Sequence, residues 1–156
     1  MPLGENQSLS QDFIDILSAF SEESVEYILV GGYALGFHGY ARATGDIDLW
    51  VRSEAANADR VMRALKSFGA PLFEVTSADF LVIGTVFQIG LPPNRIDIIS
   101  DIAGVDFETA WPGRNIISSN GLLLPLLEKS LLLTNKKAMR RLKDLSDIEW
   151  LEKQER

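Results

Sequence analysis

Two aspartates one residue apart, Asp46 and Asp48, have the spacing that most directly suggests chemistry in this chain. They begin the segment Asp-Ile-Asp-Leu-Trp-Val over 46–51, whose alternation predicts a half-buried β-strand. Alternate side chains of a strand share a face, so both carboxylates and Trp50 point away from the core, with the aspartate Cα atoms about 7 Å apart. That spacing suits a divalent ion held between them. A lone Asp-x-Asp is more often a solvated strand face, so the interpretation depends on its surroundings.

A third aspartate, Asp97, lies in a second alternating segment over 95–99. When Ile96 and Ile98 face the core, Asp97 must face the other side. If the two strands pair side by side, three carboxylates converge, and such like charges need a proton or a cation between them. Two Mg²⁺ or Mn²⁺ ions would supply the positive charge, since these ions prefer oxygen ligands. The alternative is an edge-strand acid paired with Arg95.

Two adjacent glycines, Gly31 and Gly32, follow an apolar segment that predicts a strand over 27–30. Glycine permits close approach of the backbone and unusual dihedral angles, so the amides of this pair can face a phosphate at the start of a following helix. An ordinary turn would use the same two residues. The pair becomes informative only together with the carboxylates.

A basic segment lies near the end of an acidic chain, whose formal net charge is −7 at pH 7. Residues 136–143 contain no acid and five cations, namely Lys136, Lys137, Arg140, Arg141 and Lys143. A run of charge is usually a solvated face, but in a chain this acidic it is also the segment best able to bind a polyphosphate. The overall negative charge disfavours a surface devoted to nucleic acid, because such affinity comes from neutralising phosphates.

The order of these features resembles the signature of the nucleotidyltransferase superfamily typified by DNA polymerase beta. The shared features are a glycine pair, a connection ending in Arg-Ala-Thr-Gly at 42–45, and Asp-Ile-Asp at 46–48. Within that superfamily the chain is similar to small bacterial nucleotidyltransferases related to minimal nucleotidyltransferases and abortive-infection toxins. The segment 135–148 resembles their C-terminal pattern of a lysine, an arginine, Lys-Asp and a further aspartate. The resemblance covers roughly residues 10–152.

This resemblance implies a reaction in which a nucleoside monophosphate moves from an NTP to an acceptor hydroxyl and pyrophosphate is released. Two Mg²⁺ or Mn²⁺ ions would serve as cofactors. The implied catalytic and metal-binding residues are Asp46, Asp48 and Asp97. The implied nucleotide-binding residues are Gly31, Gly32, Arg42, Thr44, Lys136 and Arg141. Many members have Gly-Ser where this chain has Gly-Gly, so a serine contact to phosphate is missing here.

The sequence leaves the acceptor and the biological role open. The acceptor could be a tRNA, a protein or a small molecule. A different class of function is an antitoxin-like or regulatory subunit, which would use the same fold to engage a partner protein with little or no catalysis. In that case the apolar and aromatic positions of the C-terminal helices, including Trp150, would decide association. A nucleotide-sugar glycosyltransferase would also use Asp-x-Asp, but such domains are normally longer.

Composition limits the possible sites. The 156 residues include no cysteine and a single histidine, His38, so disulfides, thiolate chemistry and histidine-rich metal sites are excluded. No apolar stretch has the length of a membrane span, and the N-terminus lacks a signal sequence, so we expect a cytoplasmic protein. We expect one α/β domain over 1–156 with a mixed, mostly antiparallel central sheet flanked by helices.

Periodicity and end signals place the other elements. Residues 1–7 lack periodicity and are expected to be disordered, and an amphipathic helix follows over about 10–20. A second helix is expected to end at Gly69. The segment 81–89 is expected to form a hairpin with 95–99. Pro125 suits the first turn of a helix, so the C-terminal helices are expected over 125–156.

Overall fold

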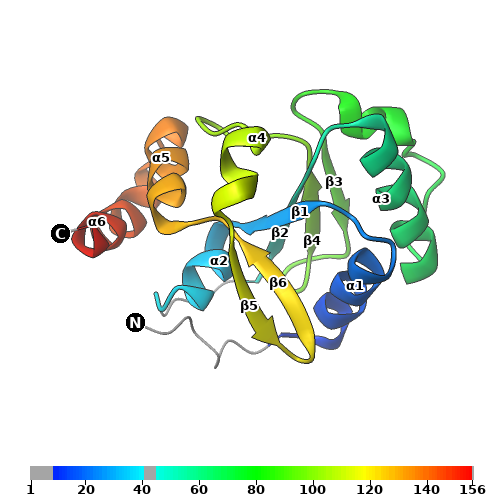
Figure 1. The fold of residues 1–156 in the computed structure, drawn as a ribbon, viewed down its shortest axis with the longest axis horizontal. Helices are drawn as coiled ribbons and strands as arrows, with labels where there is room; N and C mark the ends of the chain where they lie inside the picture. Colours follow the sequence, from blue (N-terminus) through cyan, green and yellow to red (C-terminus); the bar gives the residue numbers. More distant parts are fainter. Residues whose placement is uncertain (1–8, 41–44, 156) are drawn as a thin grey trace.

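The centre of the fold is a mixed β-sheet, seen in a computed structural model that describes residues 9–40 and 45–155 (Figure 1). Within those residues the sheet has six strands, in the order β3 (Val86–Ile89), β4 (Ile96–Ile99), β2 (Ile47–Val51), β1 (Tyr27–Val30), β6 (Leu122–Leu126) and β5 (Asn115–Ser119). The pairs β1–β2, β3–β4 and β5–β6 are antiparallel, whereas β2–β4 and β1–β6 are parallel. The expected mixed, mostly antiparallel sheet is therefore confirmed.

Two helices cover one face of this sheet. These are α1 (Gln11–Glu22) and α3 (Ala55–Phe68), which pack against each other and bury the larger core cluster together with the inward residues of β1, β2 and β4 (Figure 1). Helix α1 begins after Ser10, whose side chain accepts a hydrogen bond from the Phe13 amide. Helix α3 ends at Gly69 in the left-handed conformation, as expected.

The other face is covered only in part. The short helix α4 (Phe107–Ala110), α5 (Lys129–Met139) and α6 (Leu145–Gln154) build a second cluster against it, and Trp50 is 2% exposed within this cluster. Trp50 lies on the face opposite Ile47, Leu49 and Val51, as expected, but it is buried there because Phe107 packs edge-on against its ring. The uncovered part of this face lies around Asp48. None of the described helices is long and apolar enough to cross a lipid bilayer.

Two expected elements have different bounds. Pro125 lies inside β6, opposite Ile116, and the C-terminal helices begin at Lys129. A short apolar run fits a buried strand or a helix equally well, and here pairing with β1 and β5 decides for the strand. The expected strand over 81–89 is confined to β3, since a 3₁₀ turn, η1 (Ser77–Leu81), precedes it. Its antiparallel pairing with β4 is confirmed.

A loop over 101–105, between β4 and α4, packs against α5. The Asn135 side chain donates a hydrogen bond to the Ala103 carbonyl at 2.9 Å. Gly104 has φ +78°, and a Cβ added there would lie 2.7 Å from the Ala138 Cβ. This close approach holds α5 opposite the strands that carry the three aspartates.

We expect Gly104→Ala to lower the free energy of unfolding by about 1–3 kcal/mol more than Gly121→Ala, as measured by urea titration. Gly121 is a matched control, because its φ is +76° and an added Cβ has open space. Both variants incur the left-handed backbone cost, and only the first also forces the loop away from α5. Equal losses in the two variants would contradict the close contact.

Candidate active site

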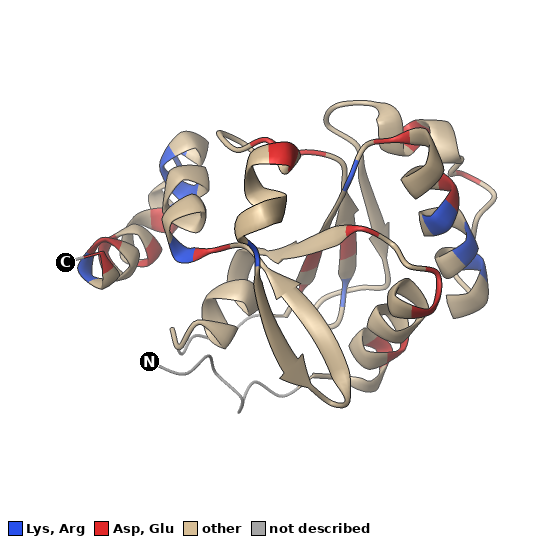
Figure 2. Cartoon of the chain, viewed as in Figure 1, with Lys and Arg blue, Asp and Glu red and all other residues tan. Residues whose placement is uncertain are grey.

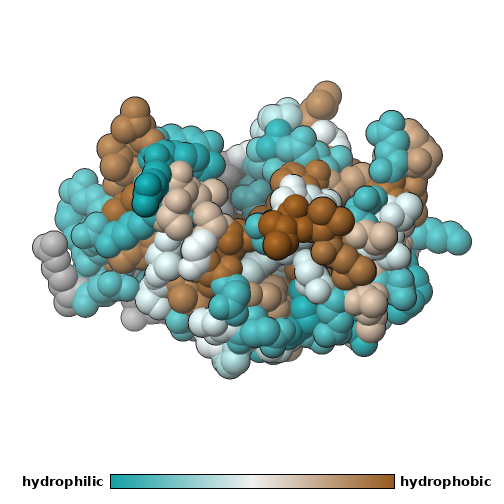
Figure 3. Space-filling view, turned by 90° about the horizontal axis from the view of Figure 1, so that it is seen from above, coloured by the Kyte–Doolittle hydropathy of each residue, from teal (hydrophilic) through white to brown (hydrophobic). Residues whose placement is uncertain are grey.

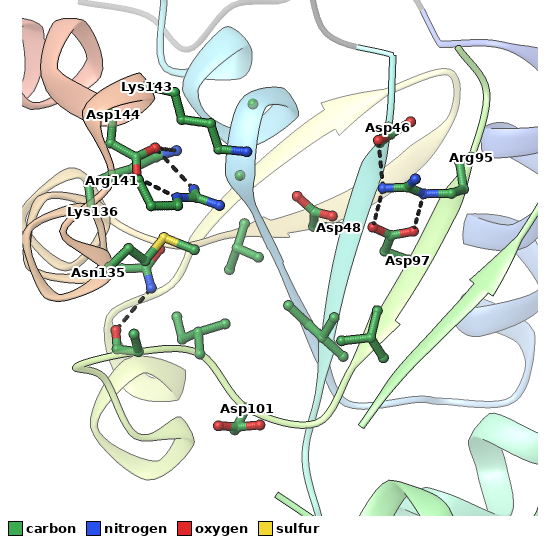
Figure 4. Close-up of a pocket in the computed structure, with 18 residues that line it drawn as sticks. Asp46, Asp48, Arg95, Asp97, Asp101, Asn135, Lys136, Arg141, Lys143 and Asp144 are labelled. Carbon is green, nitrogen blue, oxygen red and sulfur yellow. Dashed lines mark hydrogen bonds and ion pairs between the residues drawn. The ribbon is translucent and has the colours of Figure 1, made fainter. Parts of the chain in front are cut away.

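A cleft of about 500 Å³ lies between the sheet and the C-terminal helices (Figure 4). It is lined by the predicted residues Gly31, Gly32, Asp46, Asp48, Asp97, Lys136 and Arg141. The other two, Arg42 and Thr44, lie outside the described residues. Figure 2 shows acidic residues on the central strands and basic residues on α5. Side chains far apart in the sequence thus share one cavity.

The carboxylates converge because of the register between β2 and β4. These parallel strands pair Asp48 with Asp97, and Asp46 precedes Asp48 by one strand repeat. The residues that alternate with these aspartates along the two strands, including Ile47 and Ile96, point to the opposite face and are buried in the larger core cluster. A shift of one residue would exchange these faces, so the core fixes the position of the carboxylates.

Arg95 occupies the space between two of the three aspartates (Figure 4). Its Nε lies 2.8 Å from Asp97 Oδ1, and its Nη2 lies 3.1 Å from Asp97 Oδ2 and 2.9 Å from Asp46 Oδ2. The hydrogen bonding to Asp97 raises the pKa of Arg95. The pairing of Asp97 with Arg95 that the sequence left open is therefore present. Arg95 was missed as a cleft residue, although its position two before Asp97 on a strand predicts a shared face.

The three aspartates do not form a ready-made metal site. Over residues 9–40 and 45–155, no three His, Cys, Asp or Glu side chains are placed to hold one ion together. In this arrangement the Arg95 fork contacts both oxygens of Asp97 and one of Asp46. The donor set nevertheless fits Mg²⁺ or Mn²⁺, since it consists of carboxylate oxygens on one face. A divalent ion on Asp97 would compete with the guanidinium for the same oxygens.

Asp48 lies beside the first glycine of the pair. Helix α2 (Gly31–Phe37) begins directly at Gly31, where an ordinary turn had been the alternative. Gly31 has φ +72°, and an added Cβ would lie 2.2 Å from Asp48 Oδ2, so a larger residue would be strained and would displace the Asp48 carboxylate. Burial raises the pKa of Asp48 to about 7, and the charges of Asp97 and Asp46 add to this effect. Half-buried, Asp48 faces two like charges, and both effects disfavour its anion.

In metal-free buffer we expect the free energy of unfolding to fall as the pH rises from about 4 to about 7. Asp48 binds its proton more tightly in the folded chain, so this stabilisation is present at low pH and is lost as the pH passes the folded value of about 7. Asp48→Asn should reduce the fall by about 2 kcal/mol, because each pKa unit is worth about 1.4 kcal/mol and solvent screens part of the effect.

Urea titrations in EDTA at several pH values between 4 and 8 measure this difference. Asp59→Asn, an exposed aspartate on α3, is the control and should leave the pH dependence unchanged. If the free energy of unfolding changes with pH identically in the wild type and Asp48→Asn, folding does not raise the pKa of Asp48.

The basic wall of the cleft is an ion-pair network. Lys136 Nζ lies 3.1 Å from Asp144 Oδ1 and 3.2 Å from Asp147 Oδ2, while Arg141 holds Asp144 through two hydrogen bonds of 2.7 and 3.0 Å. Burial alone would raise the pKa of Asp144, but the hydrogen bonds from Arg141 and Lys136 hold it below the usual range. Lys136 is 5% exposed, whereas the Arg141 side chain is 39% exposed. Lys136 therefore supports the wall, and Arg141 with the exposed Lys143 faces the cleft.

We expect Lys136→Ala to lower the free energy of unfolding by about 3–5 kcal/mol, because it leaves Asp144 and Asp147 buried without their lysine. The adjacent Lys137→Ala is a matched control. Its exposed ammonium lies 3.9 Å from Glu152, and the change should cost less than about 1 kcal/mol. Urea titration at pH 7 compares them, and similar small losses would mean that Lys136 is not a structural cation.

The single histidine has a structural position. His38 ends α2, is 1% exposed and lies 2.8 Å from the Leu127 carbonyl through its Nε2, which donates the hydrogen bond. It is not among the residues that line the cleft. His38 therefore connects α2 to the segment between β6 and α5, and it takes no part in the candidate chemistry.

Comparisons with known proteins bear on the fold. No model of a protein family matches the chain, and a search of curated proteins finds no match. Among solved structures, the chain resembles a crystal structure of a Thermotoga maritima protein that is a nucleotidyltransferase by provisional assignment. The two share 15% identity with a TM-score of 0.59, over 97% of this chain and 98% of that chain. At this identity the likeness shows a nucleotidyltransferase-type fold.

Proposed function

We propose that this protein is a divalent-cation-dependent nucleotidyltransferase that moves a nucleoside monophosphate from an NTP to an acceptor hydroxyl. The observation that carries the proposal is one cleft in which Asp46, Asp48 and Asp97 face Arg141 and Lys143. Carboxylates alone would suit a cation, and arginine with lysine alone would suit a phosphate. Their combination suits a metal-bound polyphosphate. The fold supports the same class, although function rests on the site and not on the fold.

Each carboxylate has a proposed role. Asp46 and Asp48 would hold both ions, and Asp97 would hold the one nearer the acceptor. When bound, Mg²⁺ or Mn²⁺ ions would supply Lewis acidity for the attacking and leaving oxygens. Asp97 would accept the proton of the acceptor hydroxyl while the new bond to the α-phosphorus forms and the bond to the bridging oxygen breaks. Pyrophosphate would leave with the electrons of that bond.

The proposed phosphate-binding side chains are the cations that are exposed in the cleft. Arg141 and Lys143 can reach a ligand in the cleft, and charge-assisted hydrogen bonds from them would bind the triphosphate. The backbone at Gly31 and Gly32 lines the cleft beside Asp48, where only glycine permits so close an approach. Lys136 would contribute through Asp144, by holding Arg141 in place. Arg42 and Thr44 keep their sequence-based assignment to the nucleotide.

The alternative, a binding subunit for a partner protein, is favoured by a different observation. Leu142 is 86% exposed and Leu145 is 59% exposed, although both lie beside the cleft wall. Figure 3 also shows apolar patches on one face of the molecule, between hydrophilic side chains. Trp150, by contrast, stacks on Tyr40 within the same chain at 5.0 Å between ring centroids. A partner would therefore contact the exposed leucines.

Transfer of an α-³²P-labelled nucleotide tests the proposal. Each NTP is incubated with Mg²⁺, the protein and either tRNA or a cell lysate, and labelled products are separated as RNA, protein or small molecules. We expect label transfer by the wild type, and a loss of at least about a hundredfold in Asp97→Asn, because stabilisation specific to the transition state is removed. Asp59→Asn on α3 should keep full activity.

The reverse sensitivity would favour the binding subunit. If a folded triple alanine variant of Asp46, Asp48 and Asp97 keeps full biological activity, catalysis is not the function. In that case Leu142→Asp should abolish association with the partner while the three aspartates remain dispensable.

A further inference from the structure

We propose that Arg95 is a built-in counter-cation that competes with divalent metal ions for Asp46 and Asp97, so that a metal ion enters the site only as the guanidinium leaves. This inference rests on the proposed function, because it concerns the same cleft. It makes Arg95 a positioning residue, since it would act on the metal ligands and not on the reacting atoms.

The geometry of Arg95 supports this role. Arg95 directly precedes β4 and lies two residues before Asp97, so the two side chains share the face that also carries Asp48. The planar fork makes a bidentate contact with Asp97 and a further contact with Asp46. Such a contact is specific to arginine, because a lysine ammonium cannot match two carboxylate oxygens in one plane. The fork thus spans the two strands whose carboxylates are the candidate ligands.

The carboxylates cannot serve arginine and metal at the same time. Asp97 is 7% exposed, and both of its oxygens already accept hydrogen bonds from the guanidinium. A divalent ion bound to either oxygen at about 2.1 Å would lie within a few ångströms of a positive guanidinium. Asp97 is buried, so solvent screens that repulsion only in part. Metal binding and the arginine contact are therefore alternatives.

The displaced guanidinium would then need another anion. Asp144, the acid that lines the cleft on the opposite wall, is already bound by Arg141 and Lys136. A triphosphate in the cleft would supply the missing partner, and arginine binds phosphate oxygens through the same fork. Metal and triphosphate should therefore bind cooperatively, and by linkage each should raise the affinity of the other equally.

Mn²⁺ binding to the metal-free protein tests the competition without any catalytic assay. The probe is Mn²⁺ alone, whose free ion is measured by electron paramagnetic resonance during titration. We expect Arg95→Gln to bind Mn²⁺ at least tenfold more tightly than the wild type, since three carboxylates lose their internal cation. Arg95→Lys keeps the charge without the fork and should fall between the two.

A matched control separates this effect from the general acidity of the protein. Arg63→Gln removes the same charge from an exposed arginine on α3 that pairs with Glu23, outside the cleft. It should leave Mn²⁺ affinity within twofold of the wild type. The double variant Arg95→Gln with Asp48→Asn should lose the gain, which assigns the binding to the aspartate site.

The cooperativity has its own readout. At matched free Mn²⁺ concentrations, inorganic tripolyphosphate should raise the Mn²⁺ affinity of the wild type several-fold more than that of Arg95→Gln. If Arg95→Gln does not fold, Arg95→Lys serves in both titrations, and thermal unfolding in EDTA identifies the folded variants.

The outcomes separate the two proposals. Equal or weaker Mn²⁺ binding in the folded Arg95 variants overturns the role of Arg95, even if the wild type transfers labelled nucleotide. Tighter Mn²⁺ binding in those variants together with no transfer by the wild type overturns the proposed function and leaves the role of Arg95 in place. Absence of Mn²⁺ binding in every variant, with or without tripolyphosphate, overturns both.

Discussion

The parallel pairing of β2 with β4 is the constraint on which the candidate site depends. Its register places Asp48 beside Asp97 and is fixed by Ile47, Ile96 and their neighbours, which fill the core on the opposite face. Three acids are thereby held together by the same apolar burial that stabilises the domain. The electrostatic cost is visible at Asp48, where burial and like charges raise the pKa to about 7. The fold thus maintains a cluster that the free side chains would avoid.

The cleft reduces this cost through its own cations. Arg95 neutralises part of the acidic wall, and Lys136 with Arg141 neutralises the buried Asp144 on the basic wall. Each wall of the cleft is thus built of ion pairs whose charged side chains also line the cavity. An incoming metal-bound polyphosphate would exchange partners with these pairs, adding a cation to the acidic wall and an anion to the basic one. Such an exchange keeps the local charge nearly balanced throughout binding.

The sequence predicts what depends on local pattern. Alternation identified β2 and β4 and the shared face of their aspartates, and Gly69 ended α3 as its conformational freedom requires. The burial of Lys136 could not be predicted in this way, because it depends on a turn at Arg140, whose φ of 56° brings Asp144 back toward α5. Pro125 was misassigned for a similar reason, since its place in β6 depends on pairing of that strand with β5 and with β1, which is distant in the sequence. The spacing of Arg95 and Asp97 predicts their shared face, whereas the further contact of Arg95 with Asp46 depends on side-chain packing, which spacing does not specify.

Anomalous diffraction would show whether the aspartate cluster binds metal ions beside a nucleotide. The crystals are grown with Mn²⁺ and the α,β-methylene analogue of whichever NTP binds. We predict an anomalous peak in contact with Asp46 and Asp48, with the Arg95 guanidinium moved off these carboxylates and the triphosphate near Arg141. Nucleotide bound in the cleft while Arg95 still joins Asp46 to Asp97, with no anomalous peak, would contradict the account.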